Sequence, residues 1–141
     1  MASSCKVVLT CTSHRHCFAC GPENEGGLGL VFTKYDDGHV GAQCVINERY
    51  QGYPGIVQGG IVATILDCAM TNCLFAHGVE AMTVRLNVQF HENVFINESL
   101  TVEAALISTR GRVYELDASI TQRAKVRASA SGRFMRSRSG V

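Results

Sequence analysis

One stretch, residues 50–78, constrains the fold of this chain more than any other. It reads YQGYPGIVQGGIVATILDCAMTNCLFAHG and contains a single acidic residue, Asp67. From Gly60 to His77 apolar residues recur at helical spacing on nearly every side, which predicts a buried helix of about five turns. Gly78 is the type of residue that ends a helix. Because a helix that is apolar on most sides must be covered, we expect the rest of the chain to wrap around it.

The one polar stripe of this helix carries its one charge. At about 100° per residue, Gly60, Thr64, Asp67 and Thr71 lie on the same face. A carboxylate inside an apolar helix needs a reason, because an unpaired buried charge is costly. Gly59 and Gly60 leave backbone N–H groups uncovered at the positive end of the helix dipole, where an anion or a developing oxyanion is stabilised. We interpret the stretch as a binding loop, an anion-receiving helix N-terminus and a catalytic acid two turns later.

The segments that flank the helix have the pattern of β-strands. Before it, residues 28–34 and 40–45 enclose the turn sequence Asp-Asp-Gly, which predicts a hairpin. After it, apolar and polar residues alternate in four segments, which predicts an antiparallel meander with one solvated face: residues 84–90, 100–106, 114–121 and 126–134. The expected fold class is α+β, with about six antiparallel strands curved around one long central helix.

Length and charge limit the classes of function. A chain of 141 residues corresponds to one domain, here residues 28–141, preceded by an irregular N-terminal segment, residues 1–27. The net charge of +1 indicates no nucleic-acid partner and no polybasic membrane patch. No uninterrupted apolar run reaches the roughly 18 to 20 residues that span a bilayer, and the N-terminus lacks a convincing signal peptide. We therefore expect a cytoplasmic protein without a membrane span.

Seven cysteines are many for this length, and two of them form a C-x-x-C. Cys17 and Cys20 follow His14 and His16, so both a zinc site and a redox site are conceivable. A second ligand pair is missing, and no thioredoxin-like strand–helix context surrounds the motif. The sequence favours a turn packed with small residues, and we expect neither a metal nor a cofactor.

Four segments, taken in order, resemble one known family. They are CFACGPENEGGLGL, GIVQGGIVATILD, MTVRLNVQF and ASASGRF, and together they extend over residues 17–134. The pattern is similar to that of PaaI-like acyl-CoA thioesterases, which have the hotdog fold. The resemblance implies hydrolysis of a fatty-acyl- or aryl-CoA to the free acid and CoA. It also implies a homodimer or homotetramer with the active site between two subunits.

The resemblance implies roles for individual residues. Asp67 matches the catalytic carboxylate, which acts as nucleophile or as general base on water. Gly59 matches the residue whose N–H polarises the thioester carbonyl, and Thr83 matches the Ser/Thr that orients the water or the carboxylate. Gln58 departs from the family, which generally has His before Gly-Gly. Glutamine can donate a hydrogen bond but cannot shuttle a proton at neutral pH.

Further residues are expected to contact the substrate. Gln51 or Gln58 would help to place the thioester, and Gly60 and Thr64 lie on the same helix face as the carboxylate. Arg85, Arg133 or Arg136 would meet the phosphates of CoA, although each of them taken singly also fits a solvated surface arginine. The acyl group itself cannot be read from the sequence, because packing determines the depth of the pocket.

Two other functions remain open at this stage. A hotdog dehydratase or hydratase needs a His paired with a carboxylate, and Gln58 argues against this function because it replaces that His. His91 could substitute for it, but we expect His91 to be an exposed residue at a strand end. A non-catalytic acyl-CoA-binding module is supported by Gln58 and opposed by the presence of Asp67 and Thr83.

Overall fold

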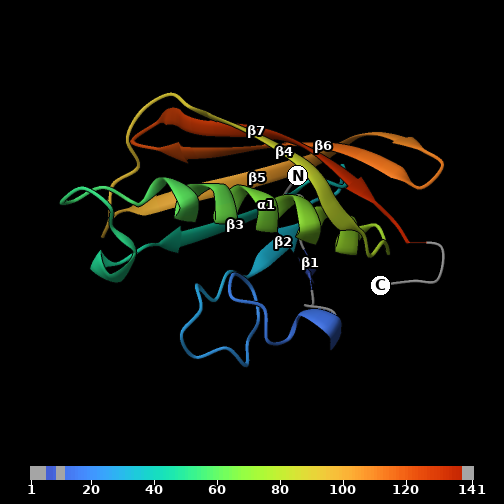
Figure 1. Ribbon diagram of the computed structural model, residues 1–141, viewed down its shortest axis with the longest axis horizontal. Helices are drawn as coiled ribbons and strands as arrows, with labels where there is room; N and C mark the ends of the chain where they lie inside the picture. The colour runs from blue at the N-terminus through green and yellow to red at the C-terminus, as the bar shows by residue number, and fades with distance from the viewer. Residues whose placement is uncertain (1–5, 9–11, 138–141) are drawn as a thin grey trace.

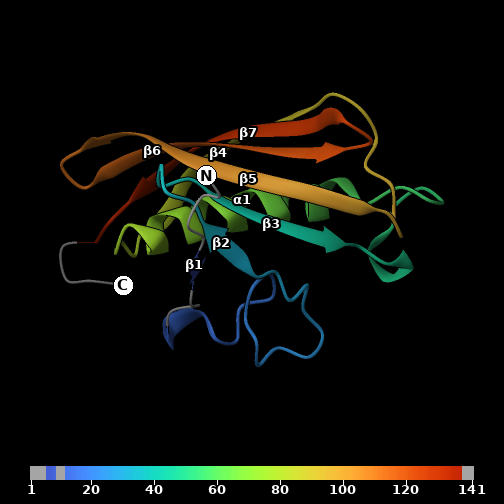
Figure 2. The same ribbon diagram turned by 180° about the vertical axis from the view of Figure 1, so that it is seen from behind.

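One helix, α1 (Gly59–Ala76), lies along the concave side of a curved antiparallel sheet (Figures 1 and 2). The computed structural model describes residues 6–8 and 12–137. The strands are β1 (Lys6–Val8), β2 (Phe32–Lys34), β3 (Val40–Val45), β4 (Met82–Phe90), β5 (Ser99–Arg110), β6 (Val113–Gln122) and β7 (Lys125–Met135). Two short 3-10 helices, η1 (Thr12–His14) and η2 (Glu48–Tyr50), lie in the connections. The predicted fold class, a central helix wrapped by an antiparallel sheet, is confirmed.

Helix α1 begins and ends within one residue of the predicted limits. The side chain of Gln58 caps its N-terminus by accepting a hydrogen bond from the backbone N–H of Ile61, and Gly78, with φ at 75°, follows its C-terminal cap. Ten of its residues are buried. Although its 18 residues are long and apolar enough to cross a membrane by length and composition, half of that length is buried inside the fold, as in a core helix.

The order of the strands corrects the predicted meander. The sheet runs β1-β2-β3-β5-β6-β7-β4, so β4 pairs with β7 and not with β5, which follows it in the sequence. The connection over residues 91–98 carries the chain from β4, at the edge of the sheet, past β7 and β6 to β5. Gln122 of β6 holds this connection, because its buried side chain accepts from the N–H of Phe95 at 2.8 Å and donates to its carbonyl at 3.0 Å. Alternation predicts a strand but does not say which strand lies beside it.

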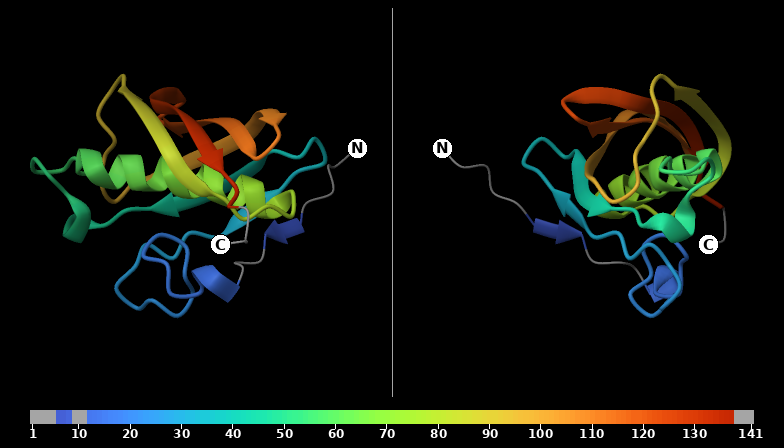
Figure 3. Two further views of the ribbon diagram at one scale, coloured as in Figure 1. Left: turned by 45° about the vertical axis from the view of Figure 1, so that its right-hand side comes forward. Right: turned by 90° about the vertical axis from the view of Figure 1, so that its left-hand side faces the viewer.

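The N-terminal segment contains more regular structure than predicted. Residues 6–8, expected to be irregular, form β1 and pair antiparallel with β2. Strand β2 is shorter than the predicted 28–34, because Leu28 and Leu30 donate their N–H groups to the carbonyls of Phe18 and Ala19 instead. Residues 12–30 therefore form a loop that lies outside the sheet and below α1 (Figure 3).

Candidate active site

The one carboxylate of α1 is hydrogen-bonded to a residue at the start of β4. Thr83 Oγ1 donates to Asp67 Oδ1 at 2.7 Å, and Asp67 is half-buried. The two residues come together because Thr83 pairs with the fully buried Phe134 of β7, so its side chain faces the helix. The predicted pairing of a helix carboxylate with a β4 hydroxyl is present in the geometry.

A β-bulge in β4 separates Arg85 from this site. Thr83 pairs with Phe134 and Arg85 pairs with Arg133, so Val84 is the extra residue. Because consecutive residues of β7 point to opposite faces of the sheet, Thr83 and Arg85 do so as well. Arg85 lines a polar surface hollow with Glu115 and Arg133, away from the helix. The structure does not bring Arg85 to the predicted substrate site.

The N-terminus of α1 is organised by Gln58. Its Oε1 accepts from the N–H of Ile61 at 3.0 Å, and a Cβ at Gly60 would lie only 2.8 Å from that oxygen. A glycine at position 60 therefore leaves room for the capping side chain. Gly59 is the first helical residue, and its N–H belongs to the first turn, where no carbonyl of a preceding turn is available. The glutamine that replaces the expected histidine thus has a local structural role.

A cavity of about 510 Å³ opens beside this helix end. Gln58 and Gly59 line it, together with residues of the preceding loop and of the segment that follows β4: Gly52, Tyr53, Ile56, Val57, Val62, Phe90, His91, Glu92, Asn93 and Val94. His91 is exposed at the end of β4, as predicted, and its Nε2 lies 2.8 Å from Ser129 Oγ. Gln51 does not line the cavity; its Oε1 accepts from the N–H of Gly55 at 3.0 Å and so holds the loop.

Asp67 faces a second, smaller cavity of about 130 Å³. The polar stripe of the helix forms one wall, through Thr64, Asp67, Cys68 and Thr71, and the hydroxyl of Thr64 donates to the carbonyl of Gly60 at 2.9 Å. The opposite wall comes from the N-terminal loop: His14, Cys17, Phe18 and Ala19. Nothing in the sequence pattern indicates this contact, although the C-F-x-C-G segment is among the four that carry the family resemblance.

The thiols next to this cavity are electrostatically linked. A hydrogen bond with the Cys68 thiol lowers the pKa of Cys20 to about 5, against the opposing effect of burial. The same hydrogen bond, together with burial, raises the pKa of Cys68 above its usual range. Two buried cysteines, one from the N-terminal loop and one from α1, therefore lie in direct contact beside Asp67.

The two halves of the predicted catalytic machinery lie apart in one chain. Gly59 and Asp67 are eight residues apart on α1, which at 1.5 Å per residue corresponds to about 12 Å along the helix axis. An oxyanion donor sits about 3 Å from the carbonyl oxygen, and a nucleophile about 3–3.5 Å from the carbonyl carbon. Direct attack therefore allows only about 6 Å between donor and nucleophile. One chain cannot supply both groups to the same carbonyl in that way.

The sequence of this chain is similar to those of known thioesterases. The family model of the thioesterase superfamily matches residues 54–128, which include α1 and β4 to β6. The acyl-coenzyme A thioesterase THEM4 of Rattus norvegicus is 31% identical over 91 residues, covering 62% of this chain and 39% of that protein. The chain thus spans well under half the length of this curated relative.

Solved structures share the fold. The crystal structure of a thioesterase superfamily protein superimposes with a TM-score of 0.82 at 31% identity, over 86% of this chain and 60% of that one. The PaaI protein from the phenylacetic acid degradation operon of E. coli superimposes with a TM-score of 0.72 at 20% identity, over 78% of this chain and 80% of that one.

Proposed function

This chain belongs to the thioesterase superfamily, and from that premise we propose that it is an acyl-CoA thioesterase. The family membership and the shared fold confirm the resemblance to PaaI-like hotdog thioesterases. The proposed reaction is hydrolysis of an acyl-CoA to the free acid and CoA. Asp67 would either attack the thioester carbonyl itself or deprotonate an attacking water.

The hydrogen bond between Thr83 and Asp67 is the observation that carries this proposal. A carboxylate on an otherwise apolar helix is held in one orientation by a hydroxyl at 2.7 Å. A hydrogen bond to an ionised group contributes about 1.5–3 kcal/mol, enough to fix a nucleophile or base relative to its substrate. Thr64 and Gly60, on the same face of α1, are the proposed neighbours of the bound thioester.

The second proposed element is the N–H of Gly59 at the start of α1. Gly59 lines the larger cavity, which is lined mainly by apolar residues and could receive an acyl group. The N-terminal end of a helix stabilises negative charge, and the thioester oxygen becomes negative as the carbonyl is attacked. Gln58 would keep this end of the helix in place, and its amide N–H groups could donate to the thioester.

We further propose that the active site is completed by a second copy of the chain. Within the described residues, β4 is the last strand of the sheet and its outer edge is unpaired. Four large apolar residues of this strand are exposed: Met82 (58%), Val84 (52%), Leu86 (37%) and Phe90 (59%). Such an edge favours pairing with another strand. A two-fold dimer could set the two helices antiparallel, so that Gly59 of one copy faces Asp67 of the other. Dimers of this kind could also assemble into a tetramer.

Hydrolysis of a panel of acyl-CoAs tests the proposed activity. The panel contains short, medium, long and phenylacetyl chains, and release of free CoA is followed for wild type and for Asp67→Asn. We expect turnover by Asp67→Asn to be lower than that of wild type by a factor of about 10²–10⁴, the usual contribution of a catalytic acid or base, and its acyl-CoA binding to be kept. Asp117→Asn, which changes an exposed carboxylate of β6, is the matched control.

Other outcomes would identify another function. Tight acyl-CoA binding without turnover by the wild type would favour the non-catalytic binding module. Hydration or dehydration of the acyl chain without release of CoA, lost in His91→Gln, would favour hydratase chemistry, because His91 lines the larger cavity. If the protein is a thioesterase, His91→Gln should hydrolyse acyl-CoA as fast as wild type.

A further inference from the structure

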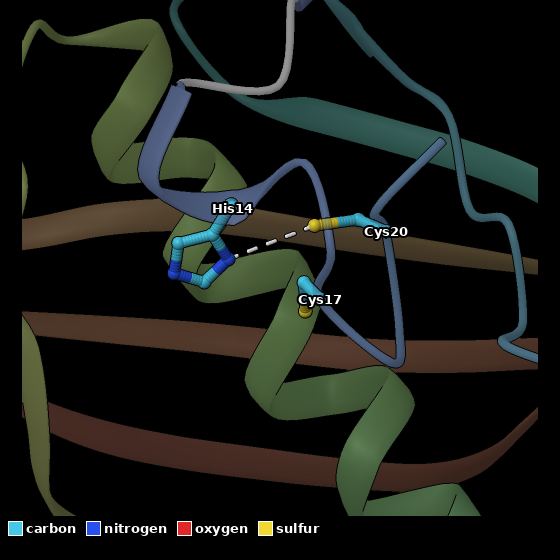
Figure 4. Close-up of side chains that lie close together, drawn as sticks. All are labelled: His14, Cys17 and Cys20. Atoms are coloured by element: carbon cyan, nitrogen blue, oxygen red, sulfur yellow. Dashed lines mark hydrogen bonds between the residues drawn. The ribbon is translucent and has the colours of Figure 1, made fainter. Parts of the chain in front are cut away.

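Three metal-ligating side chains of the N-terminal loop converge on one point beside α1. His14 Nδ1, Cys17 Sγ and Cys20 Sγ all lie within 4.8 Å of one another (Figure 4). The sequence favoured a simple turn here, because a single C-x-x-C lacked further ligands. The fold adds a third ligand, because it brings the imidazole of His14 close to the two sulfurs. We propose that His14, Cys17 and Cys20 bind a zinc ion.

The distance between one sulfur and the imidazole nitrogen is close to that in tetrahedral zinc sites. Zn–S bonds of about 2.3 Å and Zn–N bonds of about 2.0–2.1 Å place a sulfur and a nitrogen ligand about 3.6 Å apart. Cys20 Sγ lies 3.9 Å from His14 Nδ1. A shift of a few tenths of an ångström brings this pair to the bonded geometry. Side-chain rotation alone can provide such a shift.

The backbone around the two cysteines has the form of a tight ligand loop. The N–H of Ala19 donates to Cys17 Sγ at 3.4 Å, and the N–H of Gly21 donates to the Cys17 carbonyl at 2.8 Å. A Cβ at Gly21 would lie 2.3 Å from the backbone nitrogen of Cys17, so only glycine fits. An N–H directed at a sulfur stabilises its thiolate, the form that binds metal. These contacts therefore hold the backbone around Cys17 in one tight turn.

Helix α1 supports the third ligand and faces the fourth position. The ring of His14 contacts Phe75 edge-on, with centroids 5.0 Å apart, which restricts its orientation. Cys68 of α1 is buried and hydrogen-bonded with Cys20. The cavity that contains Cys68 and Asp67 borders His14 and Cys17. A water in this cavity can complete four ligands.

The chemistry of the ligands selects the ion and its role. Two thiolates and an imidazole suit zinc, whereas magnesium and calcium require oxygen ligands. Bound zinc would fix the N-terminal loop on the polar stripe of α1, where the loop forms one wall of the Asp67 cavity. This proposal does not depend on the thioesterase proposal, because its readout is metal content and not turnover.

Metal analysis of the full-length protein tests the proposal. Protein expressed with zinc and purified under reducing conditions without chelator should contain about one zinc per chain. X-ray absorption at the zinc edge should give at least two sulfur ligands at about 2.3 Å and one imidazole nitrogen. Cobalt substitution should give the charge-transfer absorption of a thiolate complex. Cys17→Ser, Cys20→Ser and His14→Ala should each weaken zinc affinity more than about 100-fold, since even outer-shell changes cost about 10–100-fold.

A matched control separates ligand loss from general damage. Cys44→Ser changes a half-buried thiol of β3, outside the cluster, and should keep its zinc. If a ligand variant does not fold, competition between wild-type protein and a chromophoric chelator still measures the affinity. Wild-type protein that holds no zinc and gives no thiolate–cobalt absorption would overturn the proposal. So would zinc that remains bound at full affinity in both Cys17→Ser and Cys20→Ser.

Discussion

Replacing Gly59 by proline should remove one backbone N–H and change little else. Gly59 is the first residue of α1, the helical position at which proline is most readily accepted. The preceding residue, Gln58, is extended with ψ at 138°, which proline requires of its predecessor. A Cβ at position 59 would approach the ring of Phe90 to 3.7 Å, an ordinary contact. The helix should therefore form as before.

The expected kinetic effect follows from the role proposed for this N–H. Loss of one oxyanion donor costs about 10²–10³ in kcat, or about 2.7–4 kcal/mol. We expect Gly59→Pro to lower kcat for the preferred acyl-CoA by this factor with little change in KM. Gly59→Ala keeps the N–H and should retain most of the activity. Thermal unfolding followed by circular dichroism checks that both variants are folded.

Two results would refute the reasoning. An unchanged kcat in Gly59→Pro would show that its N–H does not polarise the carbonyl. An equal loss in Gly59→Ala would show that added volume, and not the missing N–H, is responsible.

The same variant tests whether two copies share one site. If Gly59 of one copy serves Asp67 of the other, a mixed dimer of Gly59→Pro and Asp67→Asn contains one intact site and one doubly altered site. Random exchange of subunits makes half of the dimers mixed, so activity should recover to about one quarter of wild type. No recovery after exchange, verified by differently tagged chains, would place both groups in one subunit.

Three further changes have expected outcomes. Thr83→Val should lower kcat/KM about 10–100-fold, because it removes a hydrogen bond to Asp67 worth about 1.5–3 kcal/mol, and Thr83→Ser should restore it; wild-type kinetics in Thr83→Val would contradict this. Gly132→Ala should destabilise the fold by about 1–3 kcal/mol in urea unfolding, because its Cβ would lie 2.9 Å from Met70 Sδ; unchanged stability would show that Met70 moves aside freely. Burial raises the pKa of Cys44 from 9.0 to about 11, so the thiol ionises at lower pH in the unfolded chain than in the folded one, and the free energy of unfolding should fall as the pH rises from 9 to 11. Cys44→Ala should make this fall with pH less steep, and an equally steep fall in the variant would refute the role given to Cys44.

The sequence by itself determined the central helix, strands β2 to β7 and the position of the carboxylate. These features depend on periodicity and on local turn chemistry, which residues 50–78 and 113–135 express clearly. The four segments in order were also sufficient for the family, because their residues recur at the family's spacing and in the family's order. The substrate contacts of Gln51 and Arg85 stay predictions, because within one chain Gln51 holds its own loop and Arg85 lies on the sheet face opposite Thr83.

Only the tertiary structure decided how these elements combine. It placed β4 beside β7, and a single extra residue at Val84 turned Arg85 away from Thr83. It laid the N-terminal loop against the polar stripe of α1, which brought His14 to the two sulfurs of the C-x-x-C. Each of these arrangements depends on contacts between residues far apart in the chain. Local sequence patterns determine the conformation of a segment, whereas the free energy of packing determines which segments contact each other.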